Sequence, residues 1–148
     1  GEGSGSPYDV LQGQHVELAQ SYGGLVIALE HRYYGASLPT PDMTVDSMRY
    51  LSSHQAIADI ARFLVEFVVP TYNLTAANRI ISFGGSYPGA LSAWTRLRLP
   101  HIVFAAFSTS SPVLAQVDFA GYCQVVATSM TSSLVGGSPV CRWGHARP

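Results

Sequence analysis

Apolar residues in the first part of the chain are grouped into short runs that have the length of buried strands. Residues 24–29 form a continuous apolar run bounded by glycine and charge, and residues 79–83 form a mainly apolar run that leads into glycines. A third run, 102–107, ends in a serine-rich segment. Continuous runs, rather than strict alternation of apolar and polar residues, are typical of strands buried on both faces of a parallel sheet. The pattern therefore predicts three parallel strands.

Between these runs, the apolar positions follow a helical period. Over about 53–69 they recur every three or four residues, which places them on one face of a helix that Pro70 closes. A second helix is predicted over 87–99 and a shorter one over 14–19. Strand, helix, strand, helix, strand is the order of a parallel α/β sheet with right-handed crossovers.

The last part of the chain has a different character. Residues 113–135 are helix-like but weakly patterned, and residues 136–139 have the composition of a loop. We interpret this part as the beginning of an additional element whose remainder is absent. The opening residues, 1–7, are either a Gly/Ser linker or a loop separated from a preceding strand.

Ser86 lies where the second predicted strand ends and a helix begins, in the run Phe83-Gly84-Gly85-Ser86-Tyr87-Pro88-Gly89. In α/β-hydrolases, a serine at such a sharp turn is lifted above the sheet as a nucleophile. The helix that follows presents backbone N–H groups to the negative charge of the transition state. The alternative is a glycine-rich turn that only packs the helix against the strand.

The residues around Ser86 fit the interpretation of this serine as a nucleophile. We expect Gly84, Gly85 and Gly89 to support the turn, because side chains there would clash with the bent backbone. Pro88 occupies the last position of the usual Gly-x-Ser-x-Gly pattern. A proline in the first helical turn lacks only an N–H that the helix does not use, so the N–H of Tyr87 remains available for an oxyanion hole.

Composition and charge exclude several function classes. The chain of 148 residues is long enough for one domain with a real core, and its net charge of -1 offers no electrostatic attraction for nucleic acid or an anionic membrane. No apolar run reaches the roughly 18 residues of a membrane span. No His, Cys or acidic residues have metal-ligand spacing. We expect no metal, no other cofactor, and no nucleic-acid or membrane partner.

Three other features bear on the site and the compartment. His31, in the polar and aromatic segment 30–35, precedes Ser86, whereas α/β-hydrolases place the histidine after the serine. We therefore expect this segment to form buried ion pairs and hydrogen bonds beneath the site. Asn73 begins a glycosylation sequon, which has meaning only in a secretory chain. Cys123 and Cys141 permit a disulfide without requiring one.

Four motifs, in order along the chain, resemble the serine carboxypeptidases of the prolyl type, the family of lysosomal Pro-X carboxypeptidase, dipeptidyl peptidase II and thymus-specific serine protease. The thymus-specific branch is the most similar. The motifs are Glu30-His31-Arg32-Tyr33-Tyr34-Gly35, Leu51-Ser52-Ser53-His54-Gln55-Ala56-Ile57-Ala58-Asp59, the run around Ser86, and Ser110-Ser111-Pro112-Val113. They cover only part of the family's length.

The resemblance implies a partial α/β-hydrolase core over 1–116 and the start of an inserted helical cap over 117–148. Cys141 would then be a cap cysteine whose partner lies beyond the chain. Glu2, in a loop similar to the family's glycine-acid-glycine loop, would lie beside the oxyanion hole and meet a substrate's amino end. The alternative for Glu2 is a solvated linker acid.

The resemblance also implies a lysosomal, endosomal or secreted serine-type exopeptidase that cleaves peptides next to proline through an acyl-enzyme at Ser86. The family's catalytic Asp and His follow the cap and cannot be placed here, so we expect the 148 residues alone to be inactive. A homodimer is the candidate assembly of the parent protein. One alternative is a non-catalytic hydrolase-like module that binds peptides or proteins. Another is an esterase, which the segment 30–35 argues against.

Overall fold

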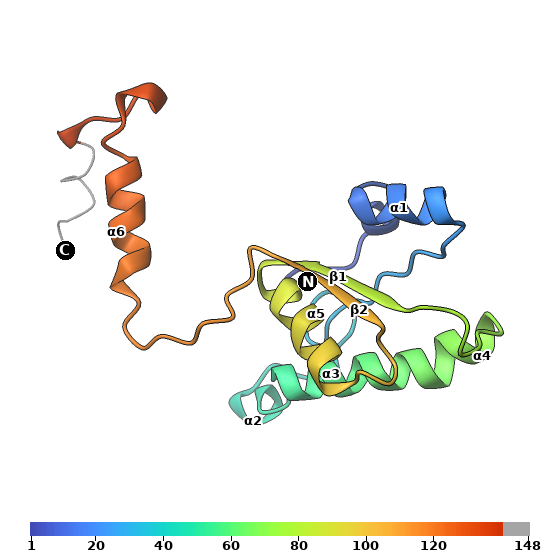
Figure 1. Cartoon of the computed structure of the whole chain (residues 1–148). Helices are drawn as coiled ribbons and strands as arrows, with labels where there is room; N and C mark the ends of the chain where they lie inside the picture. Colours follow the sequence, from blue (N-terminus) through green and yellow to red (C-terminus); the bar gives the residue numbers. More distant parts are fainter. Residues whose placement is uncertain (141–148) are drawn as a thin grey trace. The chain divides into compact units, whose positions relative to one another are not determined.

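The computed structural model describes residues 1–140 and divides into two compact units, Gly1–Val113 and Leu114–Pro148. The first unit holds a two-stranded parallel sheet with flanking helices, which is a partial α/β fold (Figure 1). The second contains helix α6 (Ala120–Ser129) and the 3-10 turn η3 (Ser133–Val135). In the described residues, no helix is long and apolar enough to cross a bilayer.

The centre of the first unit is a strand–helix–strand motif. Strand β1 (Ile81–Gly85) leads directly into helix α5 (Ser86–Arg98), and strand β2 (Ala105–Thr109) returns parallel to β1 with Gly85 opposite Thr109. The face of α5 that packs on the strands is buried at Gly89, Ala90, Leu91, Ser92 and Thr95. The Ser92 hydroxyl donates to the carbonyl of Ser82 at 3.0 Å, which ties the helix to the strand.

One long helical segment packs beside α5. It begins with α3 (Ser53–Arg62), where the Ser52 side chain caps the N–H of Gln55. It continues through the π-helical turn η2 (Phe63–Val68) and ends in α4 (Val69–Thr71). The helix predicted over 53–69 is thus confirmed. Pro70 lies inside its last turn instead of closing it, because a proline near the start of a new helical turn removes only its own N–H.

Three strand predictions need correction. Residues 24–29 are not a strand: among residues 1–140 no backbone hydrogen bond is made by 25–29, and a strand exists only where a neighbour completes the ladder. The two strands that do form are not buried on both faces as predicted, since Ile81 of β1 is 47% exposed and Phe107 of β2 is 44% exposed. The other two strands begin later than predicted, at Ile81 and Ala105. For β2 the reason is a turn, because the N–H groups of Ile102 and Val103 both donate to Leu99.

The remaining elements of the first unit are short and locally capped. The helix predicted over 14–19 is confirmed as α1 (Gln14–Tyr22), which ends at Gly23 with a φ of 65°. Two elements were not predicted. The 3-10 turn η1 (Pro7–Val10) is capped by Ser6, and α2 (Val45–Met48) is capped by Thr44. Side-chain caps of this kind stabilise turns too short to show a periodic pattern.

Candidate functional site

Ser86 is held at the junction of β1 and α5 in a strained backbone conformation. It is the first residue of α5, its φ is +58°, and its side chain is exposed. A positive φ is uncommon for a residue other than glycine, and such strain is concentrated at functional sites. Nothing in residues 1–140 hydrogen-bonds to the Ser86 hydroxyl, so this oxygen is free to meet a molecule from solvent.

Two of the three glycines around Ser86 are required by close backbone contact. A Cβ at Gly84 would overlap the carbonyl group of Pro88. A Cβ at Gly89 would overlap the Ser111 hydroxyl and lie 2.9 Å from the Thr109 carbonyl oxygen. Gly85 differs from the expectation, because a Cβ there would make only an ordinary contact of 3.4 Å with the Thr109 side chain. The sharp turn therefore depends on Gly84 and Gly89.

The environment of Ser86 can stabilise negative charge. The N–H groups of the first helical turn, including that of Tyr87, have no acceptor within the helix, and the helix dipole places partial positive charge there. Because β1 and β2 are parallel and in register, both end at the same edge of the sheet. The chain leaves β2 through Ser110, a second non-glycine residue with positive φ, +48°.

A small cavity of about 330 Å³ lies beside this turn. A carboxylate, two phenols and an indole line it, together with one leucine and two serines: Glu2, Tyr34, Leu51, Ser52, Ser53, Tyr87 and Trp94. The start of the chain lies against the turn, since a Cβ at Gly1 would be 3.8 Å from Pro88 Cγ. The structure thus brings the predicted residues Glu2 and Tyr87 to one cavity, which holds an acidic group and aromatic surface.

The segment 30–35 forms the expected polar cluster beneath the turn. Arg32 makes two hydrogen bonds of 2.6 Å to the Asp59 carboxylate of α3, and this pairing raises the pKa of the guanidinium. The Glu30 carboxylate accepts from the N–H groups of Gly5 and Ser37 at 2.7 and 2.8 Å. The predicted ion pair and hydrogen bonds are thus present, but their burial is only partial. The Asp59 side chain is 42% exposed and the bonds to Glu30 lie at the surface, whereas His31 is buried.

His31 connects this cluster to the helix that carries Ser86. Its Nε2 lies 3.0 Å from the Tyr87 hydroxyl and its Nδ1 lies 2.7 Å from the Arg32 carbonyl oxygen. Burial raises the pKa of the Tyr87 phenol, and interactions with Tyr34 and with the Glu2 charge raise it further. The phenol is therefore protonated at neutral pH and can act as a donor. Sequence reasoning missed this contact, because 56 residues separate its partners.

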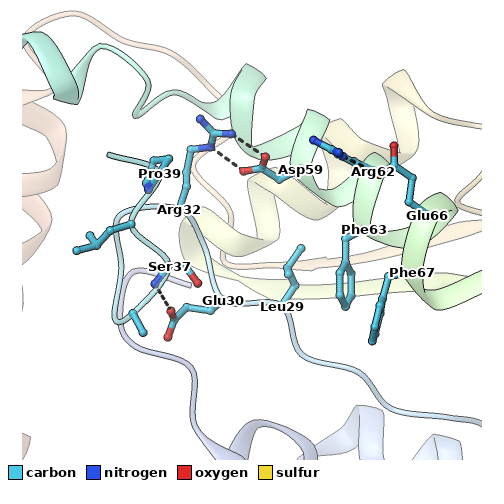
Figure 2. Close-up of a pocket in the computed structure, with 12 residues that line it drawn as sticks. Leu29, Glu30, Arg32, Ser37, Pro39, Asp59, Arg62, Phe63, Glu66 and Phe67 are labelled. Atoms are coloured by element: carbon cyan, nitrogen blue, oxygen red, sulfur yellow. Dashed lines mark hydrogen bonds and ion pairs between the residues drawn. The ribbon is translucent and has the colours of Figure 1, made fainter. Parts of the chain in front are cut away.

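A larger open cavity of about 590 Å³ was not predicted from the sequence (Figure 2). It lies between the loop around Ser37 and the α3–η2 helix. The rings of Phe63 and Phe67 project into it as a stacked pair with centroids 5.3 Å apart. The Arg32–Asp59 and Arg62–Glu66 pairs line it as well. None of its lining residues belongs to β1 or α5.

The remaining candidates lie away from Ser86 in the sequence. Asn73 is exposed in the turn after α4, with a φ of +50°. Cys123 of α6 is exposed and has no disulfide partner among residues 1–140, and Cys141 lies outside the described residues. Within residues 1–140, no three His, Cys, Asp or Glu side chains are arranged to hold a metal ion.

Comparison with known proteins extends over nearly the whole chain. The family model described as serine carboxypeptidase S28 matches residues 1–142. The chain is 46% identical to mouse (Mus musculus) thymus-specific serine protease over 141 residues, which are 95% of this chain and 28% of the relative.

Two other relatives carry names that bear on the compartment. Lysosomal Pro-X carboxypeptidase of Pongo abelii is 34% identical over 84% of this chain and 25% of the relative. A probable extracellular serine carboxypeptidase of Arthroderma benhamiae is 41% identical over 74% of this chain and 16% of the relative. The chain thus spans about a quarter of the length of the mouse and Pongo relatives.

Proposed function

The chain belongs to the serine carboxypeptidase S28 family, and from this premise we propose that Ser86 is the nucleophile of a serine-type exopeptidase. One observation carries the proposal. Ser86 is an exposed, strained, non-glycine residue that lies directly between a parallel strand and the N-terminus of a helix. A turn of this kind fixes the hydroxyl by backbone geometry and places it next to unpaired N–H groups.

The proposed reaction forms and hydrolyses an acyl-enzyme. The Ser86 oxygen attacks the scissile carbonyl carbon and its proton passes to a histidine, which delivers the proton to the leaving amine as the peptide bond breaks. Water, deprotonated by the same histidine, then attacks the ester and releases the acid and the free serine. Through both steps, the N–H of Tyr87 donates to the oxygen that bears the negative charge.

We assign the catalytic His and Asp to residues other than those described. No histidine and no carboxylate within residues 1–140 hydrogen-bonds to Ser86, and a serine without its base attacks poorly at neutral pH. From the family resemblance, we further propose that the 148 residues alone are inactive. Residues 117–148 are proposed as the beginning of a helical cap.

The proposed substrates are peptides cleaved next to proline. One relative carries the name Pro-X carboxypeptidase, and the cavity beside Ser86 offers the aromatic surface of Tyr34, Tyr87 and Trp94 against which a proline ring can pack. Glu2, in the same cavity, is proposed to pair with the amino end of the substrate.

The proposed compartment is the lysosome, the endosome or the extracellular space. The names of two relatives contain the words lysosomal and extracellular. Asn73 is exposed, as an acceptor of N-linked glycan must be. We further propose that the parent protein forms a homodimer.

A second candidate function is a non-catalytic module that binds peptides. The unpartnered Ser86 hydroxyl is the observation that favours it, because a binding protein needs the cavity and not the base.

Labelling with a fluorophosphonate probe separates the two functions. In the complete polypeptide that contains these 148 residues, we expect covalent labelling that Ser86→Ala abolishes. The matched control is Ser110→Ala, which removes another exposed serine hydroxyl at positive φ on the same sheet edge and should leave labelling unchanged. The 148-residue chain should remain unlabelled by the probe and should bind proline-containing peptides weakly. Failure of the complete polypeptide to label would favour the binding module.

The same preparation tests the substrate class. Peptides with proline at the penultimate position from either end are incubated with the labelling-competent protein, and the products are identified by mass spectrometry. We expect cleavage next to proline that Ser86→Ala reduces by at least about 10³-fold. Equal cleavage of alanine-containing control peptides would contradict the proposed proline preference.

A further inference from the structure

The contact between His31 and Tyr87 joins two parts of the chain that meet only in the folded protein. His31 lies shortly after the segment 24–29, and it is only 7% exposed. Tyr87 is the residue after Ser86, so its peptide N–H belongs to the same peptide plane as the Ser86 carbonyl. A hydrogen bond that orients the Tyr87 side chain therefore restrains the same residue whose N–H is the proposed oxyanion donor.

The direction of these hydrogen bonds follows from their partners. The Arg32 carbonyl can only accept, so Nδ1 of His31 carries the hydrogen of that 2.7 Å contact. A neutral imidazole then has a lone pair on Nε2, which accepts from the Tyr87 hydroxyl at 3.0 Å. A phenol is protonated at neutral pH, and burial raises the pKa of the Tyr87 hydroxyl further, so this hydroxyl can donate. The two hydrogen bonds thus run in one direction, from the Tyr87 hydroxyl to His31 and from His31 to the Arg32 carbonyl.

The residues around His31 are themselves bonded to neighbouring elements. The guanidinium of Arg32 is fixed by Asp59 of α3 and also donates to the carbonyl of Tyr50 at 3.0 Å. The Tyr34 ring meets the imidazole of His31 edge-on, with centroids 5.2 Å apart. His31 is therefore held in place by contacts that do not involve Tyr87.

We propose that His31 is a positioning residue: by accepting from the Tyr87 hydroxyl, it fixes the peptide plane that carries the oxyanion-hole N–H of Tyr87. This inference rests on the proposed function of Ser86. His31 makes no hydrogen bond to Ser86 and does not line the cavity beside it, so its proposed effect runs through Tyr87. Removal of an oxyanion donor costs about 10²–10³-fold in rate, so a donor that is present but poorly oriented should cost less, about tenfold.

The test compares acylation rates of active-site-titrated variants of the complete polypeptide with a fluorophosphonate. Tyr87→Phe removes only the hydroxyl, and His31→Leu removes only the acceptor; each should slow acylation about tenfold. If the two residues act as one unit, the double variant should be no slower than either single variant. His31→Gln, whose amide oxygen can accept from Tyr87, should restore most of the rate.

Tyr33→Phe is the matched control. Tyr33 is a buried neighbour whose hydroxyl donates to the Ser47 carbonyl, away from Ser86. Its loss should lower the unfolding temperature and leave the acylation rate per active site unchanged. A purely structural role of the His31–Tyr87 pair predicts this same outcome for Tyr87→Phe, and such a result would overturn the inference.

The outcomes also separate the inference from its premise. If the unmodified polypeptide is not labelled at Ser86, the proposed function fails and the inference fails with it. If the unmodified polypeptide is labelled and Tyr87→Phe is labelled equally fast, only the inference fails. If His31→Leu does not fold, Tyr87→Phe decides the question alone.

Discussion

Residues 24–29 and residues 81–85 are both apolar-rich runs, yet only the second is a strand. The run 81–85 has β2 beside it and α5 across its face, and every residue of it is in the ladder. The run 24–29 makes no ladder with any residue in 1–140. Exposure does not distinguish the two runs, since Leu25 is 53% exposed and Ile81 of β1 is 47% exposed. An apolar run alone therefore does not make a strand, which also needs a neighbouring strand with free N–H and C=O groups.

The strongest test of this comparison concerns a backbone contact at the end of β1, for which the run 24–29 has no counterpart. Gly84→Ala places a methyl group against the carbonyl of Pro88, and neither backbone can move without breaking β1 or α5. We expect the free energy of unfolding to fall by about 3 kcal/mol or more, measured by urea denaturation. Gly85→Ala, one residue along, should change it by less than about 0.5 kcal/mol. Equal effects at the two glycines would refute the geometry of the turn.

The comparison is sharpened by removing one leucine from each region. Leu91→Ala empties a site in α5 that is 5% exposed and should lower the free energy of unfolding by about 3 kcal/mol. Leu25→Ala, in the unpaired run, should cost less than about 1 kcal/mol, because half of that side chain already contacts water. Chemical denaturation of the two variants checks both values. A large loss at Leu25 would show that the run is buried in solution.

The smallest expected effect is the pH dependence of stability at Glu30, the residue that follows the run 24–29. Hydrogen bonds from Ser37 and from the backbone of Gly5 hold the pKa of the Glu30 carboxyl below its ordinary value. A carboxyl whose pKa is lower in the folded state stabilises the fold above its unfolded pKa, and this stabilisation is lost as the pH falls through the folded pKa. The unfolding temperature should therefore drop slightly on acidification below about pH 4.5.

Glu30→Gln should reduce this acid-side drop, as followed by thermal unfolding between about pH 6 and pH 3. Glu17→Gln is the control, since the carboxylate of Glu17 has no hydrogen bond in the described part of the chain. Identical pH profiles for Glu30→Gln and the unmodified protein would show that the hydrogen bonds of this carboxylate to Gly5 and Ser37 do not stabilise the fold.

The site was easier to predict from the sequence than the sheet. The turn at Ser86 is encoded within seven adjacent residues, so its strand, bend and helix could all be derived locally. The ladder partner of a strand is chosen by residues far along the chain, and the run 24–29 carries no local sign of lacking one. The same limit applies to the His31–Tyr87 contact and to the cavity beside Phe63 and Phe67, which arise only when separate elements meet.

The left-handed residues at Ser86 and Ser110 have a consequence for the shape of the sheet edge. Each of two neighbouring strands ends in a kink at nearly the same level, so neither continues upward as an extended chain. Both strands therefore end together at one edge of the sheet. A molecule that contacts this edge meets the ends of two strands at once.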